Sequence, residues 1–439
     1  MKFRNLILFS ILCSFVLVGC SNDDDEDPVA TTQTFRVTVE NISTEFEYFQ
    51  SGMFNTPVNA TTAGPAMPGN AYEFSFNAGP GHKLSFATMF VQSNDLFYAP
   101  SGDGIELFNN GTPVTGDITA QVQLWDSGTE VNEEPGVGMN QAPRQSGPNT
   151  GADENGTVRE ISAVADGFTY PAVSDNIRVT LSSTGDNAFT VRIENLSASN
   201  TPLAPGVYVV HSSSNPLFEE GAADRDQGLE ALAEDGDASG LATWLGDRSG
   251  VTSPLAPGVW AVHGTGNPLF TTGTADLGEG LEALAEDGSP DALATSLESK
   301  AIVTSSGAFN TPVGASAAGP LMPGNSYEFT FTATQGEFLS FATMYVQSND
   351  LFYSPGMAGI ALWNGDSPIS GDITSQLRLW DPGTEVNQFP GAGADQAPRQ
   401  SGPNTGAAEN GTVQPIENVT DGFTYQANSD VIRVTVNLQ

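Results

Sequence analysis

The sequence predicts a mainly β protein composed of two antiparallel β-sandwich domains, and two observations support this prediction. The first is the alternation of apolar and polar residues in short runs such as "TFRVTVEN", "AYEFSFNA", "QVQLWD" and "IRVTL". Alternation of this kind, with turn residues about every ten positions, is typical of antiparallel strands that bury one face. The second is an internal repeat, which predicts a duplicated domain.

The repeat covers most of the chain. The block from Gly52 to Val179 recurs from Gly307 to Val434, and both copies contain "FNTPV", "VQSNDLFY" and "QAPRQSGPNTGA". Each copy is preceded by a strand-like segment, "TFRVTVENIS" in the first and "AFTVRIENLS" in the second. We therefore expect domain 1 over residues 34–182 and domain 2 over residues 187–439.

The second domain is expected to carry a tandem α/β insertion at about residues 201–300. "LAPGVYVVH" and "LAPGVWAVH" begin two similar units, and each unit continues into "GLEALAEDG". In the first unit Leu229, Leu232 and Ala233 have the i, i+3, i+4 spacing of a helix, which ends at a Gly. Each unit should contribute a strand, a loop and short helices that cap one edge of the sandwich.

The beginning of the chain predicts a lipoprotein signal. An apolar run from Leu6 to Val18 follows two basic residues and is too short to span a bilayer as a helix. It ends in "LVGC", which resembles the bacterial signal for cleavage and lipidation at a cysteine. Residues 1–19 would then be removed and Cys20 would carry the membrane-anchoring acyl chains. An ordinary secretory peptide with an incidental cysteine is the alternative.

Residues 20–33 are expected to form an acidic linker, which contains "SNDDDEDP". This run resembles the export signal that places some bacterial lipoproteins on the outer face of the outer membrane, so we expect surface display. A plain spacer on a periplasm-facing lipoprotein would be equally acidic and is the alternative. Both cysteines, Cys13 and Cys20, lie in the leader, so we expect folding without a disulfide bond.

The charge balance limits the possible partners. The chain has 52 acidic and 14 basic residues and a formal net charge of −38 at pH 7. Such a surface repels phosphate backbones, which argues against a nucleic-acid partner. It favours divalent cations instead.

Several of these segments together resemble the spondin amino-terminal domain in its bacterial form. They are "FRVTVENIS", the "PGVWAVH…NPLF…GLEALAEDG" segment, "LSFATMFVQSNDLFY", "LWDSGTE" and "QAPRQSGPNTG". The resemblance covers nearly all of the mature chain and implies C2-like β-sandwiches that bind calcium and mediate adhesion. The disulfide cysteines of animal members are absent, and "PGVxxVH" occurs twice in the second copy but not in the first, so the family's partners do not carry over.

The resemblance also implies the calcium ligands. The family has one aspartate just after a core strand, followed further on by an Asp-x-Gly-Thr-Asp pair. In this chain the second aspartate of the pair is a glutamate, which keeps the charge and adds a methylene. The implied ligands are Asp95, Asp126 and Glu130 in the first copy, and Asp350, Asp381 and Glu385 in the second.

The residues by themselves also favour calcium, which takes six to eight oxygen ligands. "DSGTE" places two carboxylates around a Gly-Thr turn, and gathering carboxylates costs free energy through repulsion unless a cation offsets it. The candidate ligands are acidic in both copies, whereas Asp103 and Glu106 correspond to Ala358 and Ala361. The alternative is that the aspartates cap turns and the glutamates are solvated.

Other polar residues are expected to have structural roles. His211 and His263 could suggest zinc, but a zinc site needs three or four nitrogen or sulfur ligands, so packing at a strand end is expected. Arg144 and Arg399 are expected to form ion pairs beneath a loop.

Asn94 and Asn349 precede the candidate aspartates. They are expected to shape the turns, and the alternative is that each adds an amide oxygen to the metal site.

The sequence contains no Gly-x-Ser-x-Gly motif, phosphate-binding loop or catalytic cysteine motif, so we expect a protein that is not an enzyme. The expected function is that of a calcium-binding lipoprotein of the outer membrane, which acts in adhesion or matrix interaction through an unknown protein or glycan partner. One alternative is a carbohydrate-processing hydrolase or accessory that uses the acidic cleft. Another is a structural spacer that calcium rigidifies.

Overall fold

The computed structural model describes residues 31–185, 187–197 and 201–439. The expected signal peptide, the lipidation site Cys20 and nearly all of the acidic linker lie outside the described residues. Within the described ranges, no helix has the length and apolar character needed to cross a membrane.

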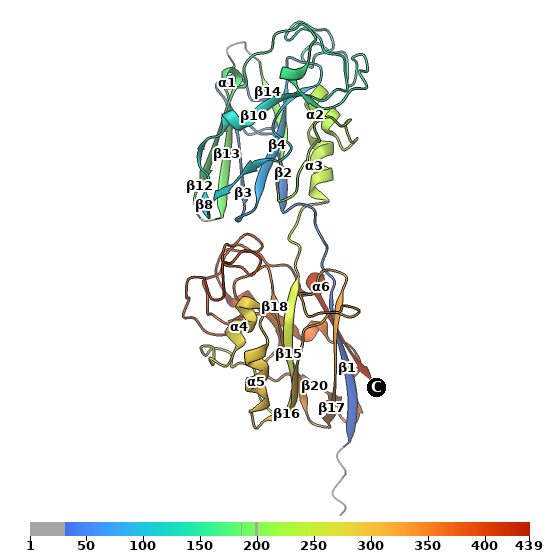
Figure 1. The fold of residues 1–439 in the computed structure, drawn as a ribbon, viewed down its shortest axis with the longest axis vertical. Coiled ribbons are helices and arrows are strands. Elements are labelled where there is room, and N and C mark those ends of the chain that lie inside the picture. Colours follow the sequence, from blue (N-terminus) through green and yellow to red (C-terminus); the bar gives the residue numbers. More distant parts are fainter. Residues whose placement is uncertain (1–30, 186, 198–200) are drawn as a thin grey trace, which may run out of the picture.

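The chain forms two β-sandwiches that are stacked along the long axis of the molecule (Figure 1). Each sandwich pairs a seven-stranded sheet with a four-stranded sheet, and the neighbouring strands within these sheets are antiparallel. The prediction of a mainly β protein with two antiparallel sandwiches is therefore confirmed. We call the upper one in Figure 1 the first sandwich and the lower one the second sandwich.

The first sandwich contains most of the N-terminal half of the chain. Its larger sheet has the order β11 (Arg159–Glu160), β10 (Val122–Asp126), β5 (Leu96–Pro100), β4 (Lys83–Phe90), β14 (Leu203–His211) and β2 (Gln50–Phe54), with β6 (Ile105–Glu106) paired to β4. Its smaller sheet has the order β3 (Ala71–Asn77), β13 (Ala188–Asn195), β12 (Ile177–Ser183) and β9 (Gly116–Asp117). The remaining elements are β7 (Phe108–Asn109), β8 (Thr112–Pro113), α1 (Val173–Asn176), α2 (Leu229–Asp235), α3 (Ser239–Gly246) and the 3₁₀ turns Thr119–Gln121 and Ile161–Ala163.

The second sandwich repeats this architecture. Its larger sheet has the order β16 (Val303–Phe309), β15 (Leu255–His263), β18 (Phe338–Tyr345), β19 (Phe352–Pro355), β24 (Leu377–Asp381) and β25 (Gln414–Pro415), with β20 (Ile360–Ala361) paired to β18. Its smaller sheet has the order β17 (Ser326–Thr334), β1 (Thr32–Asn41), β26 (Ile432–Leu438) and β23 (Gly371–Asp372). The remaining elements are β21 (Trp363–Asn364), β22 (Ser367–Pro368), α4 (Leu281–Asp287), α5 (Asp291–Glu298), α6 (Asn428–Val431) and the 3₁₀ turns Thr374–Gln376 and Ile416–Asn418.

The strand that precedes each sequence repeat lies in a different sandwich from the one expected. These two leading strands are β1 and β13. Strand β1, from the start of the chain, pairs with β17 and β26, and Val37 lies opposite both Phe329 and Val436. In Figure 1 this blue strand lies among the orange and red strands of the second sandwich. Strand β13, which was expected to begin domain 2, pairs with β3 and β12 of the first sandwich. The expected boundaries 34–182 and 187–439 are therefore corrected.

Chain connectivity explains this exchange. Strand β13 follows β12 after a short connection, and the two pair along their full length from Ser183↔Phe189 to Ile177↔Asn195. A short hairpin closes with a smaller loss of entropy than a distant pairing, so β13 occupies the central position of the small sheet in the first sandwich. Strand β1 then occupies the equivalent position in the second sandwich.

The expected tandem insertion in domain 2 is corrected for the same reason. Strand β14 of the first unit lies between β2 and β4, whereas β15 of the second unit lies between β16 and β18. Each sandwich therefore receives one unit with its two helices, which pack on the larger sheet. Helices α2 and α3 lie beside the first sandwich, and α4 and α5 lie beside the second (Figure 1).

Aromatic side chains join the two sheets of each sandwich. In the first sandwich the ring of Phe74 stacks on Phe54 at 5.0 Å and on Tyr208 at 4.5 Å. In the second sandwich the ring of Phe329 stacks on Phe309 at 5.1 Å and on Trp260 at 5.6 Å. Since Tyr208 and Trp260 come from the "PGVxxVH" strands, each sandwich needs its own unit to complete its core.

Candidate metal centre

Strand pairing brings Asp95 and Asp126 together in the first sandwich. Asp95 lies in the turn before β5, and Asp126 is the last residue of β10, where it lies opposite Leu96. Both side chains are fully buried, with 0% exposure. The same arrangement recurs in the second sandwich, where Asp350 and Asp381 are also fully buried.

Only one of the two carboxylate oxygens of Asp95 is used by the protein. Its Oδ2 accepts hydrogen bonds from the Ser127 hydroxyl at 3.0 Å, from the Thr129 backbone N–H at 3.0 Å and from the Glu130 backbone N–H at 3.1 Å. Its Oδ1 is buried and has no hydrogen-bond partner among the described residues. The same is true of Oδ1 in Asp350. A buried carboxylate oxygen without a partner costs free energy, because its desolvation is uncompensated.

These aspartates are difficult to ionise without a cation. Burial raises the pKa of Asp95, and the neighbouring Asp126 raises it further. Burial together with the proximity of Asp381 raises the pKa of Asp350 well above its ordinary value. The structure therefore gathers acidic groups whose charged forms need compensation.

The "DSGTE" turn depends on its glycine. Gly128 has φ of 71°, and the equivalent Gly383 also has φ of 71°. A Cβ at Gly128 would lie 2.6 Å from the backbone nitrogen of Thr157. The turn directs the N–H of Gly128 to Oδ1 of Asp126 at 2.7 Å, so a larger residue would disturb the aspartate directly.

Glu130 has a different environment from the two aspartates. Its Oε1 accepts a hydrogen bond from the N–H of Gly151 at 2.6 Å, and its Oε2 accepts one from the amide of Asn94 at 3.3 Å. Glu385 makes the equivalent contacts to Gly406 and Asn349. The structure thus places these glutamates where they fasten the long "QAPRQSGPNTGA" loop, beside rather than within the aspartate pair.

Glu154 takes the third position that the sequence analysis gave to Glu130. Carboxylate oxygens of Asp95, Asp126 and Glu154 lie within 4.8 Å of one another. The Oε2 of Glu154 is buried and lacks a hydrogen-bond partner within the described part of the chain. The counterpart in the second sandwich is Glu409, which is exposed. Because Glu154 follows a loop of more than twenty residues after "DSGTE", no local motif marks it.

A buried glutamate from the "GLEALAEDG" helix lies beside the "GTE" turn of each centre, and the sequence analysis missed it. Glu234 on α2 and Glu286 on α4 are 2% and 1% exposed, and both carboxylate oxygens of each lack a hydrogen-bond partner among the residues described. Thr129 lies beside Glu234 and Thr384 beside Glu286, and these threonines also donate to Asp95 and Asp350. The sequence did contain a sign of this glutamate. Glu234 directly follows Leu232 and Ala233 on the apolar face of the helix, and the same helix recurs in the second unit.

Burial raises the pKa of Glu234 to about 8 and that of Glu286 to about 7. Nearby acidic side chains, including Glu130 and Glu385, contribute to these raised pKa values, whereas the threonines oppose them. A positive charge in the same space would favour the ionised form of each glutamate.

The two centres differ in one charged residue. Arg159 lies 3.1 Å from Oδ2 of Asp126 and also forms an ion pair with Glu154. The second sandwich has Gln414 at the equivalent position, and within the described ranges Asp381 has no ion pair with a lysine or arginine. Burial raises the pKa of Asp381, consistent with this lack of compensation.

Exchanging these two residues should exchange the metal affinities of the two centres. We expect Arg159→Gln to strengthen calcium binding in the first sandwich by about tenfold, and Gln414→Arg to weaken it in the second by a similar factor, because calcium affinity follows the net charge of the ligands. Titration calorimetry would measure each affinity in a chain whose other centre carries Asp350→Asn or Asp95→Asn. Unchanged affinities in both variants would show that the guanidinium does not compete with the ion.

The histidines behave as expected from the sequence. His211 is fully buried, its Nε2 lies 2.9 Å from the Ser85 hydroxyl and its Nδ1 lies 2.7 Å from the carbonyl oxygen of Ser213. His263 has equivalent contacts with Ser340 and Gly264. The prediction of a packed, hydrogen-bonded histidine at each strand end is confirmed.

The expectation of ion pairs for Arg144 and Arg399 is wrong for the described residues. Arg144 donates to Gln92 and Gln141, and Arg399 donates to Gln396 and to the carbonyl oxygen of Gly391. Burial lowers the pKa of Arg399 to about 10. Both guanidinium groups therefore donate to neutral acceptors and not to carboxylates.

The asparagines before the aspartates shape the turns, as predicted. Asn94 accepts a hydrogen bond from the N–H of Glu133 at 3.1 Å, and Asn349 accepts one from Gln388 at 3.1 Å.

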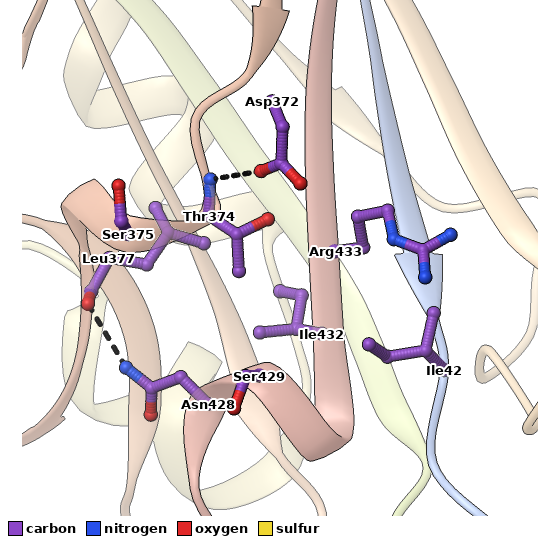
Figure 2. A pocket seen from close by; sticks show the side chains of 9 residues that line it. All are labelled: Ile42, Asp372, Thr374, Ser375, Leu377, Asn428, Ser429, Ile432 and Arg433. Carbon is purple, nitrogen blue, oxygen red and sulfur yellow. Dashed lines mark hydrogen bonds between the residues drawn. The ribbon is translucent and has the colours of Figure 1, made fainter.

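A further pocket lies away from both acidic centres. It has a volume of about 660 Å³ and lies in the second sandwich. Figure 2 shows the Asp372 carboxylate accepting a hydrogen bond from the N–H of Thr374, and Asn428 donating to the carbonyl oxygen of Leu377. Arg433 extends over strand β1, where it donates to Glu40. These polar groups are already engaged in hydrogen bonds and ion pairs within the protein, so the pocket is a poor candidate for a binding or catalytic site.

No protein-family model matches this chain, and no curated protein matches it.

Proposed function

We propose that this protein is a calcium-binding, non-enzymatic lipoprotein of spondin type, anchored in the outer membrane through Cys20 and displayed at the cell surface. Its two sandwiches would act in adhesion or matrix interaction. The observation that carries the proposal is the duplicated set of buried carboxylates whose oxygens lack partners among the described residues, at Asp95 and Glu234 and again at Asp350 and Glu286.

The donor set suits calcium in particular. All of the candidate groups are oxygen donors, and calcium prefers several carboxylate and carbonyl oxygens with water completing the shell. Asp95, Asp126 and Glu154 would hold the ion in the first sandwich, with Glu234 close to Asp95. Asp350, Asp381 and Glu286 would hold it in the second. Glu130 and Glu385 would support the loops around the ion.

A bound ion would organise the loops at this end of each sandwich. Asn132 donates to Asp126 at 2.9 Å, and Glu130 accepts a hydrogen bond from Gly151. Both ends of the loop from residue 132 to residue 151 are therefore hydrogen-bonded to residues of the acidic segment. This loop exposes the apolar side chains of Val137 and Met139, which are 61% and 69% accessible. Calcium would therefore fix the surface on which a protein or glycan partner can dock.

Burial of the carboxylates favours binding over catalysis. A glycoside hydrolase needs two carboxyl groups that reach a sugar in an open cleft. Asp95 and Asp126 are fully buried, and backbone N–H groups and Ser127 already surround one oxygen of Asp95. Such groups suit an enclosed cation better than a sugar substrate.

Calcium should raise the melting temperature of metal-free protein by roughly 5–10 °C at saturating concentration, because an ion that binds only the folded state stabilises it. Asp95→Asn combined with Asp350→Asn should remove most of this rise, whereas Asp103→Asn, at an exposed acid outside the centres, should leave it unchanged. Differential scanning calorimetry and metal analysis of protein purified without chelator would measure both quantities.

The same variants test the adhesive role. Beads coated with the wild-type protein should bind a matrix preparation in calcium and release it in chelator, and the double variant should not bind. If calcium stabilises the protein but the double variant adheres normally, the ion rigidifies a spacer. If the purified protein contains no calcium and its melting temperature does not respond, the proposal fails.

A further inference from the structure

A second group of acidic residues lies next to the first centre, in the segment that leads into helix α2 and in the first turn of that helix. Carboxylate oxygens of Asp224, Asp226 and Glu230 lie within 4.8 Å of one another. They line a pocket of about 250 Å³, to which Asn149, Glu234 and Asp235 also contribute. None of these residues except Glu234 takes part in the calcium centre described above.

The turn at Asp224 is built so that one carboxylate oxygen remains free. Its Oδ2 accepts a hydrogen bond from the N–H of Asp226 at 2.9 Å. Its Oδ1 is buried and has no partner among the residues that the structure describes. The side chain of the intervening Arg225 donates to the carbonyl oxygen of Asn215, so this guanidinium does not form an ion pair with the group.

Glu234 gives independent support for a ligand in this pocket. Its side chain is 2% exposed, it lines the pocket, and neither of its carboxylate oxygens has a hydrogen-bond partner within the described residues. Asn149 reaches the pocket from the long loop and donates to Glu230 at 2.9 Å. An almost fully buried carboxylate that shares a pocket with Asp224, Asp226 and Glu230 is ionised only at a cost in free energy, which a bound cation would offset.

We propose that Asp224, Asp226 and Glu230 form an additional divalent-cation site, which is specific to the first sandwich. The ion would be a hard cation such as calcium, since the donors are carboxylate and amide oxygens. Glu234 would lie between this ion and the one held by Asp95, because it lines the acidic pocket and also lies beside Thr129.

The second sandwich provides a natural comparison. Asp276 and Glu282 occupy the positions of Asp224 and Glu230, and the N–H of Gly278 donates to Asp276 at 2.9 Å, as Asp226 does to Asp224. However, Gly278 takes the place of Asp226, so one carboxylate is missing. Lys300 forms an ion pair with Glu279, which lines this pocket. The second sandwich should therefore lack the additional site.

Backbone geometry allows the missing carboxylate to be moved between the two sandwiches. Asp226 has φ of 57° and Gly278 has φ of 69°, so both adopt the left-handed conformation, which aspartate tolerates better than most residues. A Cβ added to Gly278 meets no atom within 4 Å. Both Asp226→Gly and Gly278→Asp should consequently fold.

Calcium alone serves as the probe, and the full mature chain is titrated by calorimetry with metal analysis after dialysis. The wild type should bind one ion more than Asp226→Gly, or bind its last ion at least about tenfold more tightly than that variant. Gly278→Asp should gain a site. Equal stoichiometry and equal affinities in the wild type and Asp226→Gly would overturn the proposal.

A further variant separates this proposal from the proposed function. Asp95→Asn combined with Asp350→Asn removes the two principal centres but should keep one calcium ion in the acidic pocket of the first sandwich. Loss of all binding in that double variant would overturn the additional site while leaving the principal centres supported. Conversely, a wild type that binds a single ion, lost in Asp226→Gly and retained in the double variant, would support the additional site and contradict the principal ones.

Discussion

Val37→Asp should unfold the second sandwich and leave the first one folded, although Val37 lies near the start of the chain. Strand β1 is central in its sheet, between β17 and β26, and Val37 is fully buried with Phe35 and Val39. An unpaired carboxylate at this position costs several kcal/mol, which is of the order of the stability of a domain.

Val191→Asp is the matched control for this substitution. Val191 occupies the same position on β13 that Val37 occupies on β1, and it is also fully buried. Its replacement should unfold the first sandwich and spare the second. If β1 belongs to the second sandwich and β13 to the first, as in the structure, each variant therefore unfolds the sandwich opposite to the one expected from the sequence repeats.

Amide hydrogen exchange distinguishes the outcomes, because β4 reports on the first sandwich and β18 on the second. In Val37→Asp, we expect protection to be lost in β18 and kept in β4, and in Val191→Asp the reverse. If Val37→Asp exposed β4 instead, each leading strand would belong to the domain that follows it in sequence, and the observed topology would be wrong.

Metal-free protein should become less stable as the pH rises from about 4.5 to about 8, and calcium should remove this dependence. Glu234 has its pKa raised from 4.5 to about 8 by burial, and the pKa values of Asp95, Asp350 and Glu286 are also raised. Between these limits the folded protein holds protons that the unfolded chain has released. Stability is therefore complete below the ordinary carboxyl pKa and is lost as the pH passes the raised values.

Calcium removes the need for these carboxyl groups to be protonated in the folded protein, because it binds their ionised form. The increase in melting temperature caused by calcium should thus grow with pH, from near zero at pH 5 to roughly 10 °C at pH 8. Scanning calorimetry across this range, with and without chelator, measures both trends. Glu234→Gln combined with Glu286→Gln should flatten the metal-free curve, since glutamine needs no proton to remain neutral.

A control at exposed acids should keep the pH trend. Glu45 is exposed and lies outside both acidic centres, so Glu45→Gln should melt like the wild type at each pH. A metal-free protein whose stability increased from pH 5 to pH 8 would show that the buried carboxylates are already compensated by the protein.

The candidate site could be predicted only in part. Asp95 and Asp126 could be named from the sequence because the family resemblance implies them as ligands and both recur in the second copy. Glu130 recurs as well, but its side chain binds Gly151 and Asn94. These contacts depend on how the loop between Glu130 and Gly151 folds back, which the local sequence does not determine. Glu154 and Glu234 are distant in sequence from both aspartates, and only the packing of a loop and of helix α2 brings them close.

The sequence by itself determined the β class, the duplication and the helix in each "GLEALAEDG" unit, because alternation, turn residues and helical spacing are local properties of the chain. The candidate aspartates were implied by the resemblance to the spondin amino-terminal domain. Only the tertiary structure decided which sandwich receives β1 and β13, which sandwich receives each "PGVxxVH" strand, and which glutamate faces the aspartates. The physical reason is that "TFRVTVENIS" and "AFTVRIENLS" present nearly the same buried face, so their pairing is selected by loop closure and neighbouring strands rather than by their own residues.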